Sequence, residues 1–377
     1  MSIFFKERGT SPAPQLRSAA KRESDLFQER GVDEGRLFHS PKSISSRERE
    51  IIWVLKDDRA GNYSQAIGLA EAMALQNGSE ICIKDISYGF LARVPNFLKI
   101  SGLWGIDSKS RLGILDPLIC EEEKPDIVIS AGRKTAPIAA FLRKKYQAFA
   151  VQIMHPNLDF GKFDLVVLPS HDRKVEAKNV VRVLGSLGRV NKDLLEKEYQ
   201  KFSDIFEKIE SPRIVLLVGG SSKKGIFSEK IAQNLGKQVS NVVNQMQGNL
   251  VVLNSRRTGD KVSEILDQNL NCPKTFFKWQ SPDWQNPYFA SLQAADFVIA
   301  TGDSISMCCE ICALGKPVYI FNPPEICSSK HLKFHQDLFD GGFAKRLDED
   351  LRILEKFDSK KLQETAKIAQ LPILDRL

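Results

Sequence analysis

Three polar residues, Asp303, Ser306 and Glu310, stand three and four positions apart in the segment 296–321, DFVIATGDSISMCCEICALGKPVYIF. Residues at this spacing share one face of a helix. Ser304 precedes the helical stretch and is a suitable N-cap. The unpaired N–H groups of a helix start attract anions, particularly beside a turn that contains glycine. The pattern therefore favours an anion site, although a solvated stripe on an ordinary crossover helix has the same spacing.

A second candidate for phosphate binding is GGSSKKGIFS, residues 219–228, which combines glycines with serine donors. It lacks the GxxxxGK[ST] order of a P-loop, and the first half of the chain contains no GxGxxG, which disfavours a nicotinamide cofactor. The arginine pair of NSRRT suits a diphosphate, with a solvated pair as the alternative. The residues that we expect to bind a nucleotide are Gly219, Gly220, Ser221, Ser222, Arg256, Arg257, Gly302, Asp303, Ser304, Ser306 and Glu310.

Polar residues also follow the apolar runs of the first half. In open parallel sheets, ligands bind beyond the carboxyl ends of the strands, so these residues are expected to face a cleft. Arginines and histidines at several strand ends are harder to explain as turn residues than glycines and serines are. The candidates for binding an acceptor are Asp57, Arg59, Gly61, Asn62, Gln65 and His155.

Short apolar runs alternate with helical stretches, which predicts parallel sheets covered by helices on both faces. The expected strands are 51–55, 80–86, 126–131, 149–154, 165–169, 181–187, 213–220, 250–255, 275–279, 296–301 and 318–321. We predict an α/β fold of two Rossmann-like, doubly wound parallel-sheet domains facing a cleft. The predicted parts are a flexible tail (1–48), an acceptor domain (49–195), a connector (196–212) and a nucleotide-binding domain (213–377). A last helical segment, about 358–371, is expected to pack across the hinge.

The composition is that of a soluble globular protein, with 377 residues, 42% hydrophobic and 27% charged. The net charge of +7 favours a partner that carries phosphates, or an anionic membrane surface. The seven cysteines form no regular framework, so we expect free thiols in a reducing compartment and no metal site. No apolar run approaches the ~20 residues of a membrane span.

Residues 88–115 interleave large apolar side chains with basic ones, a mixture that suits an anionic membrane interface. The alternative is a loop and a helix packed into the first domain. The apolar anchors would be Phe90, Leu91, Phe97, Leu98, Leu103 and Trp104, and the basic residues Arg93, Lys99, Lys109 and Arg111.

An ordered set of motifs resembles the elongated-mitochondria family, which includes the plant mitochondrial-fission protein and alphaproteobacterial relatives. The motifs are WVLKDDRAGNYSQAIGLAEAM, ISAGRKTAP, LVVLPSHD, LVGGSSK, NSRRT, NPYF and VIATGDSISMCCEICALGKPVYIF, within about residues 50–340. The second half is also similar to the donor domain of GT-B glycosyltransferases such as the lipid-II-forming transferase. There, a Glu in an E-x-x-x-x-G-K-P setting binds ribose, and Glu310, Gly315, Lys316 and Pro317 match it. The first loop reads KDDRAGN rather than GGTGGH, so the acceptor and the chemistry do not carry over.

The resemblance implies a cytoplasmic GT-B enzyme, peripheral at the inner face of the membrane, that transfers a sugar from a nucleotide-sugar donor to an envelope glycolipid. No tightly bound cofactor, metal or nucleic acid is expected. The alternatives are a GT-B nucleotide-sugar epimerase and a non-catalytic GT-B-shaped scaffold that acts at a membrane.

Sugar transfer needs a base across the cleft from the donor diphosphate. We expect Asp58 to be this base, with His171 as the runner-up and Arg133 orienting the acceptor. The N-terminus of the following helix would lower the pKa of Asp58. The alternative is that this carboxylate merely caps that helix.

Overall fold

The computed structural model describes residues 49–89, 103, 105–115, 124–170, 172, 175–222, 225–280 and 285–371. Both sheets of the protein lie in one compact unit, Ser45–Leu377. The tail predicted over 1–48 is outside the described residues. Among those that are described, no helix has the length and apolar character to span a bilayer.

The first sheet contains six parallel strands in the order β2-β1-β3-β4-β5-β6. The strands are β1 (Ile51–Lys56), β2 (Glu80–Asp85), β3 (Ile127–Ala131), β4 (Phe149–Ile153), β5 (Leu165–Pro169) and β6 (Val180–Val183). The strand order reverses at β1 and β3, which pair directly: β2 lies on one side of β1, and β3 to β6 follow on the other side. The carboxyl ends of β1 and β3 therefore border the crevice in which such sheets bind ligands.

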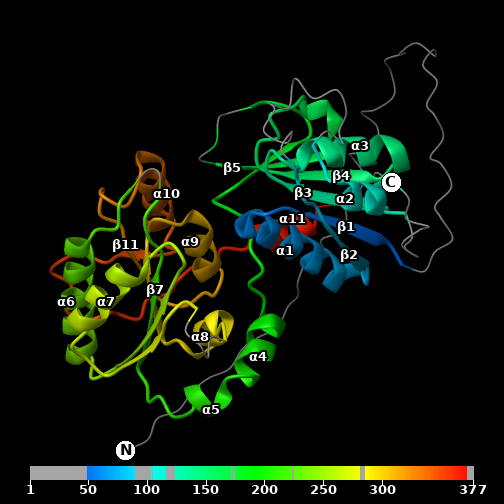
Figure 1. The fold of residues 1–377 in the computed structure, drawn as a ribbon. Helices are drawn as coiled ribbons and strands as arrows, with labels where there is room; N and C mark the ends of the chain where they lie inside the picture. The colour runs from blue at the N-terminus through cyan, green and yellow to red at the C-terminus, as the bar shows by residue number, and fades with distance from the viewer. Residues whose placement is uncertain are drawn as a thin grey trace, which may run out of the picture. The chain divides into compact units, whose positions relative to one another are not determined.

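Alternate side chains of the interior strand β1 enter two separate cores, because successive residues of a strand point to opposite faces. Ile52 and Val54 pack with α1 (Ala60–Asn77) and with α11 (Glu364–Ala369). Trp53 packs on the other face with α3 (Ala136–Tyr146). Figure 1 shows α1 and α11 on one side of these strands and α3 on the other. The remaining helices of this half are α2 (Ser108–Leu115) and the 3-10 helix η3 (Phe160–Lys162).

The second sheet is also parallel and six-stranded, in the order β12-β11-β10-β7-β8-β9. Its strands are β7 (Arg213–Val218), β8 (Asn249–Asn254), β9 (Lys274–Phe277), β10 (Phe297–Thr301), β11 (Val318–Phe321) and β12 (Lys345–Arg346). Counted along the chain, this is the Rossmann order 3-2-1-4-5-6, with its switch point between β7 and β10. The predicted fold class is therefore confirmed for both sheets.

Helices cover both faces of the second sheet (Figure 1). The helices α6 (Glu229–Gln245) and α7 (Asp260–Asn269) pack on one face. The other face is covered by α4 (Lys192–Gln200), α5 (Ser203–Phe206), α8 (Tyr288–Ala294), α9 (Ile305–Cys312) and α10 (Ser329–Asp340). Ser304 is the N-cap of α9, as predicted, and accepts a hydrogen bond from the N–H of Met307.

The segment 362–371 contacts both halves, as expected. The N–H of Leu362 donates to the carbonyl of Cys312 at the end of α9. Thr365 exchanges two hydrogen bonds with the backbone of Gly188, and Ile368 and Ala369 join the core beneath α1. The strand predicted over 181–187 ends earlier, at Val183, and Gly185 lies in a left-handed turn at φ +83°.

Candidate functional site at two strand switch points

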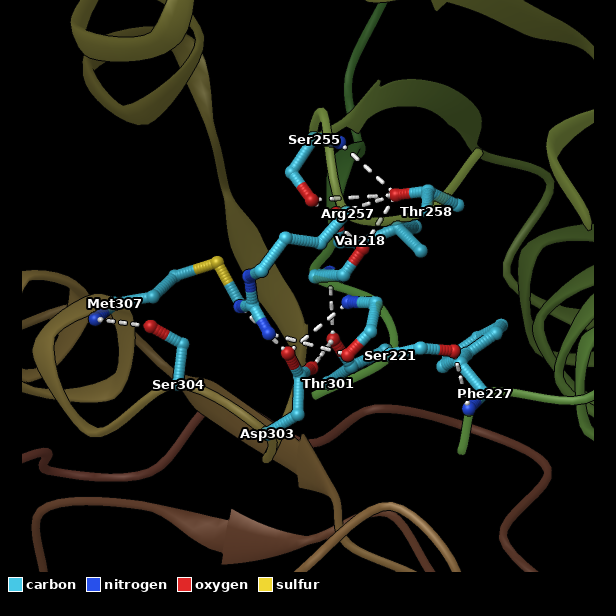
Figure 2. Close-up of polar contacts among 12 residues, drawn as sticks. Val218, Ser221, Phe227, Ser255, Arg257, Thr258, Thr301, Asp303, Ser304 and Met307 are labelled. Carbon is cyan, nitrogen blue, oxygen red and sulfur yellow. Dashed lines mark hydrogen bonds and ion pairs between the residues drawn. The ribbon is translucent and has the colours of Figure 1, made fainter. Parts of the chain in front are cut away.

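The turn after β7 is held by a buried carboxylate. Asp303 is 5% exposed and accepts from the N–H of Gly220 at 3.0 Å and from the Thr301 hydroxyl at 2.7 Å. The Arg257 guanidinium pairs with it at 2.7 Å. Figure 2 shows Arg257 reaching from the end of β8 to this carboxylate. Asp303 thus connects the ends of three strands, β7, β8 and β10.

The backbone donors of the loop 219–222 are all used inside the protein. The N–H of Gly219 donates to Thr301, that of Ser221 to the carbonyl of Arg257, and that of Ser222 to Gly225. A Cβ at Gly219 would overlap Asp303. This glycine is therefore required for tight internal packing, whereas the sequence suggested a cradle of free N–H groups for phosphate.

Free donors lie instead at the start of α9 and the end of β8. Within the described residues, the N–H groups of Ile305 and Ser306 have no acceptor, and Arg256 is exposed with no charged or hydrogen-bonded partner. Arg257 differs, because Asp303 compensates its charge. The switch point of the second sheet therefore offers a helix start and one uncompensated guanidinium, a combination suited to an anion.

Glu310, on the same face of α9, already has two hydroxyl donors. Tyr288 donates to its Oε2 at 2.8 Å and Ser64 of α1 donates to its Oε1 at 3.2 Å. Burial raises the pKa of Glu310, and these two hydrogen bonds and Arg189 oppose that effect. Glu310 is thus a contact between helices of the two sheets as well as a candidate ligand group.

The two aspartates that follow β1 have different surroundings. Asp58 is exposed, and Lys134 donates to both of its oxygens at 2.7 and 2.8 Å. The hydrogen bond from Lys134 lowers the pKa of Asp58, which is the expected direction with a different cause. Asp57 is 7% exposed and accepts from the N–H of Arg59 and from the Asn62 amide. Burial raises its pKa.

Asp58 does not cap α1, whose N-cap is Arg59 without a side-chain hydrogen bond. Arg133 is exposed in the turn after β3, next to Gly132 at φ +81°, and so lies at the same switch point. His155 follows β4, where its Nδ1 accepts from the N–H of Asn157. His171 lies outside the described residues.

The other predicted acceptor residues lie in the first turns of α1. Gly61 has open space around it, and Arg59 is exposed. Gln65 is buried, donates to the carbonyl of Gly61, and keeps its Oε1 without a partner among the described atoms. The structure thus places Asp57, Asp58 and Asn62 together after β1, while His155 lies at the carboxyl end of a different strand, β4.

Sequence reasoning missed the hydrogen-bond partners of two carboxylates: Lys134 for Asp58, and Ser64 and Tyr288 for Glu310. Each of them meets its carboxylate through tertiary contacts, and Ser64 and Glu310 are 246 positions apart. A signal for Tyr288 was available, since it belongs to the NPYF motif.

The proposed membrane stretch falls mostly outside the described residues, including Phe90, Leu91, Arg93, Phe97, Leu98, Lys99 and Trp104. Leu103 is a correction, because it is 5% exposed and packs in the core of the first sheet with Trp53. Lys109 and Arg111 are exposed on α2.

Comparison with known proteins agrees with the family resemblance that the sequence motifs suggest. The model of the family described as mitochondrial fission ELM1 matches residues 60–377. The chain belongs to this family. A relative described as an uncharacterized protein of Rickettsia prowazekii is 32% identical over 351 residues, which are 85% of this chain and 97% of that protein.

Another family member is the mitochondrial fission protein ELM1 of Arabidopsis thaliana. It is 27% identical over 273 residues, which are 66% of this chain and 63% of the plant protein. Among solved structures, UDP-GlcNAc 2-epimerase from Methanocaldococcus jannaschii aligns at a TM-score of 0.49 and 13% identity, covering 87% of this chain and 100% of that chain.

Proposed function

We propose that this ELM1-family chain is a GT-B-like glycosyltransferase that uses a nucleotide-sugar donor and a glycolipid acceptor. The observation that carries the proposal is the switch point between β7 and β10. There the N–H groups of Ile305 and Ser306 and the guanidinium of Arg256 have no protein partner among the described residues. The donor diphosphate would lie against them, because a helix start and an arginine favour that charge.

In this proposal the acceptor lies at the other switch point, between β1 and β3, and Asp57 serves as its base. A raised pKa makes Asp57 a better proton acceptor, whereas the hydrogen bond from Lys134 lowers the pKa of Asp58. Arg133 would orient the acceptor from the same turn region. This choice replaces Asp58, the residue favoured by the sequence, with its neighbour.

Donor binding is tested by thermal shift with a panel of nucleotide sugars, followed by product analysis. A ligand at 100 times its dissociation constant stabilises the fold by about 2.7 kcal/mol. Arg256→Ala should weaken binding about tenfold. The matched control is Lys237→Ala on α6, an exposed lysine on the opposite face of the sheet. If no nucleotide sugar stabilises the protein, the proposal is wrong. Product analysis would also separate a transferase from an epimerase.

The base is tested by kinetics on the active donor. Asp57→Asn should reduce turnover about a hundredfold or more with donor affinity preserved. Asp58→Asn is the matched variant and should stay within a few-fold of wild type. The opposite ranking would return the role to Asp58. Membrane contact remains a prediction, for which flotation of the full chain with anionic and neutral liposomes is the test.

A non-catalytic scaffold is the second candidate, and one observation favours it. The backbone donors of 219–222 and the carboxylate of Glu310 are already bonded within the protein. A scaffold would release no nucleoside diphosphate from any nucleotide sugar, even with lipid extracts present as acceptors. Turnover with any donor would exclude it.

A further inference from the structure

Tyr88 follows β2, the edge strand beside β1, and its backbone is held from both sides. The N–H of Ile86 donates to the carbonyl of Lys56, the last residue of β1, at 2.7 Å. On the other side, Tyr88 forms an antiparallel bridge with Ile106. Because Asp57 comes directly after Lys56, these bonds place Tyr88 at the same end of the sheet as the aspartates that follow β1.

The hydroxyl of Tyr88 is buried and has no hydrogen-bond partner among the described residues. Its ring packs against the core of the first sheet, on the side of Trp53. Buried polar side-chain atoms nearly always have a partner in the protein, in ordered water or in a ligand, because an unpaired donor costs free energy. The Tyr88 hydroxyl therefore marks a place for an acceptor atom that the described part of the protein does not supply.

Charged side chains surround this phenol. Lys134 Nζ lies 5.1 Å from the centre of the Tyr88 ring and 2.7 Å from Asp58 Oδ1. Burial raises the pKa of the Tyr88 hydroxyl, and the negative charges of Asp57 and Asp58 raise it further, because they would repel an ionised phenol. The phenol thus stays protonated at neutral pH and remains a hydrogen-bond donor.

Asp57 and Tyr88 offer complementary groups at this end of the sheet. The carboxylate can accept a proton, and the phenol can donate a hydrogen bond. A hydroxyl oxygen carries one proton and two lone pairs, so it can bond to both groups and still attack with the second lone pair. A protonated amine has no lone pair that could accept from Tyr88. The two residues together therefore suit an alcohol and disfavour an amine.

We propose that Tyr88 is a specificity-determining residue of the acceptor site, where its phenol donates to the oxygen of the attacking hydroxyl while Asp57 takes the proton. This oxygen forms a bond to the anomeric carbon of the donor sugar. The bond from that carbon to the diphosphate oxygen breaks, and the nucleoside diphosphate leaves with the electron pair. Tyr88 keeps its own proton throughout. The inference rests on the proposed function, because the donor and the base are those assigned there.

Kinetics of Tyr88→Phe in the full chain test the inference. The donor is the nucleotide sugar that thermal shift selects. The acceptors are n-octyl β-D-glucoside, which presents hydroxyls, and n-octylamine, which presents an ammonium group. The wild type should transfer to the glucoside and not to the amine. In the variant, kcat/KM for the glucoside should fall about three- to tenfold, the contribution of one neutral hydrogen bond, while the dissociation constant of the donor stays the same.

A second measurement separates this role from a structural one. Tyr88→Phe removes a buried hydroxyl without a partner among the described residues, so the melting temperature should be unchanged or higher. The matched control is Tyr319→Phe, because the Tyr319 hydroxyl accepts from the N–H of Glu355 at 2.9 Å and donates to its carbonyl at 3.1 Å. This control should melt at a lower temperature and transfer at the wild-type rate. A lower melting temperature in Tyr88→Phe would mean that the hydroxyl is bonded within the protein, and would overturn the inference.

The remaining outcomes separate the inference from the proposed function. If no nucleotide sugar binds, or if a bound one is transferred to no hydroxyl of the glucoside or of a lipid extract, the proposed function fails and the inference fails with it. If the wild type transfers sugar and Tyr88→Phe does so with the same kcat/KM, the inference is wrong while the proposed function stands. Transfer to n-octylamine as efficient as to the glucoside would lead to the same conclusion.

Discussion

Lys330 Nζ, in the first turn of α10, lies 2.6 Å from Asp172 Oδ1, which follows β5. The pair joins a helix on the second sheet to a loop of the first. Its side chains are 38% and 22% exposed, so the contact is neither fully solvated nor buried. Together with the contact between Ser64 and Glu310, it connects the two sheets through side chains rather than through the backbone.

Removal of this ion pair should have a small effect on stability. Asp172→Asn is expected to lower the free energy of unfolding by about 1 kcal/mol or less, because partly exposed pairs contribute little. Urea denaturation measures the change, and 1 M salt should reduce it further. The double variant with Lys330→Gln completes a cycle. A loss above about 2 kcal/mol would mean that the pair stabilises the junction of the sheets more strongly than its exposure suggests.

Removal of the Asp303 carboxylate, which holds the turn after β7, should lower the free energy of unfolding strongly. Asp303→Ala leaves the N–H of Gly220 and the hydroxyl of Thr301 buried without an acceptor, and removes the charge partner of Arg257. We expect a loss of about 3 kcal/mol in the free energy of unfolding. Arg256→Ala is the control and should change stability by less than about 0.5 kcal/mol. Equal effects would contradict the internal role of Asp303.

A methyl group at Gly185 should not be tolerated. The residue has φ +83°, and a Cβ there would overlap Cys309 Sγ and approach Phe334. Gly185→Ala should therefore lower stability by at least about 2 kcal/mol. The matched change is Gly61→Ala in α1, where no atom lies within 4 Å. This control should leave the melting temperature unchanged or slightly higher, because alanine favours helix.

Stability should fall in mild acid because of His335. The residue is 0% exposed, and burial lowers its pKa from the ordinary 6.5 to about 4. Between these values the unfolded chain binds a proton that the folded protein does not, so stability decreases as pH drops through this window. From pH 7 to pH 5 the contribution is about 2 kcal/mol.

Urea denaturation at several pH values checks this effect. His335→Gln should show a flatter dependence of the unfolding free energy on pH than the wild type. Parallel curves for the two proteins would mean that other groups cause the acid sensitivity.

Most of the sheet architecture was predictable because the inner strands are buried on both faces and therefore read as continuous apolar runs, whereas the two-residue, partly exposed edge strand β12 was not predicted. The cap of α9 was predictable for a similar reason, since Ser304 acts on a residue three positions away. The sequence could not predict which polar groups of the candidate site are free to bind a ligand and which are bonded within the protein. Asp58 and Lys134 are 76 positions apart, and Gly220 and Asp303 are 83 apart, so local patterns contain no sign of either contact. The same side chains that suggest a ligand site can satisfy one another.

The return of the chain to the first sheet has a consequence for any attempt to express the two halves separately. A fragment that stops at Pro212 would contain every strand of the first sheet but would lack Ile368 and Ala369, which cover part of α1. During synthesis, the core beneath α1 stays incomplete until Ile368 and Ala369 have left the ribosome. A stable first half would thus require residues 362–371 to be fused back through a linker.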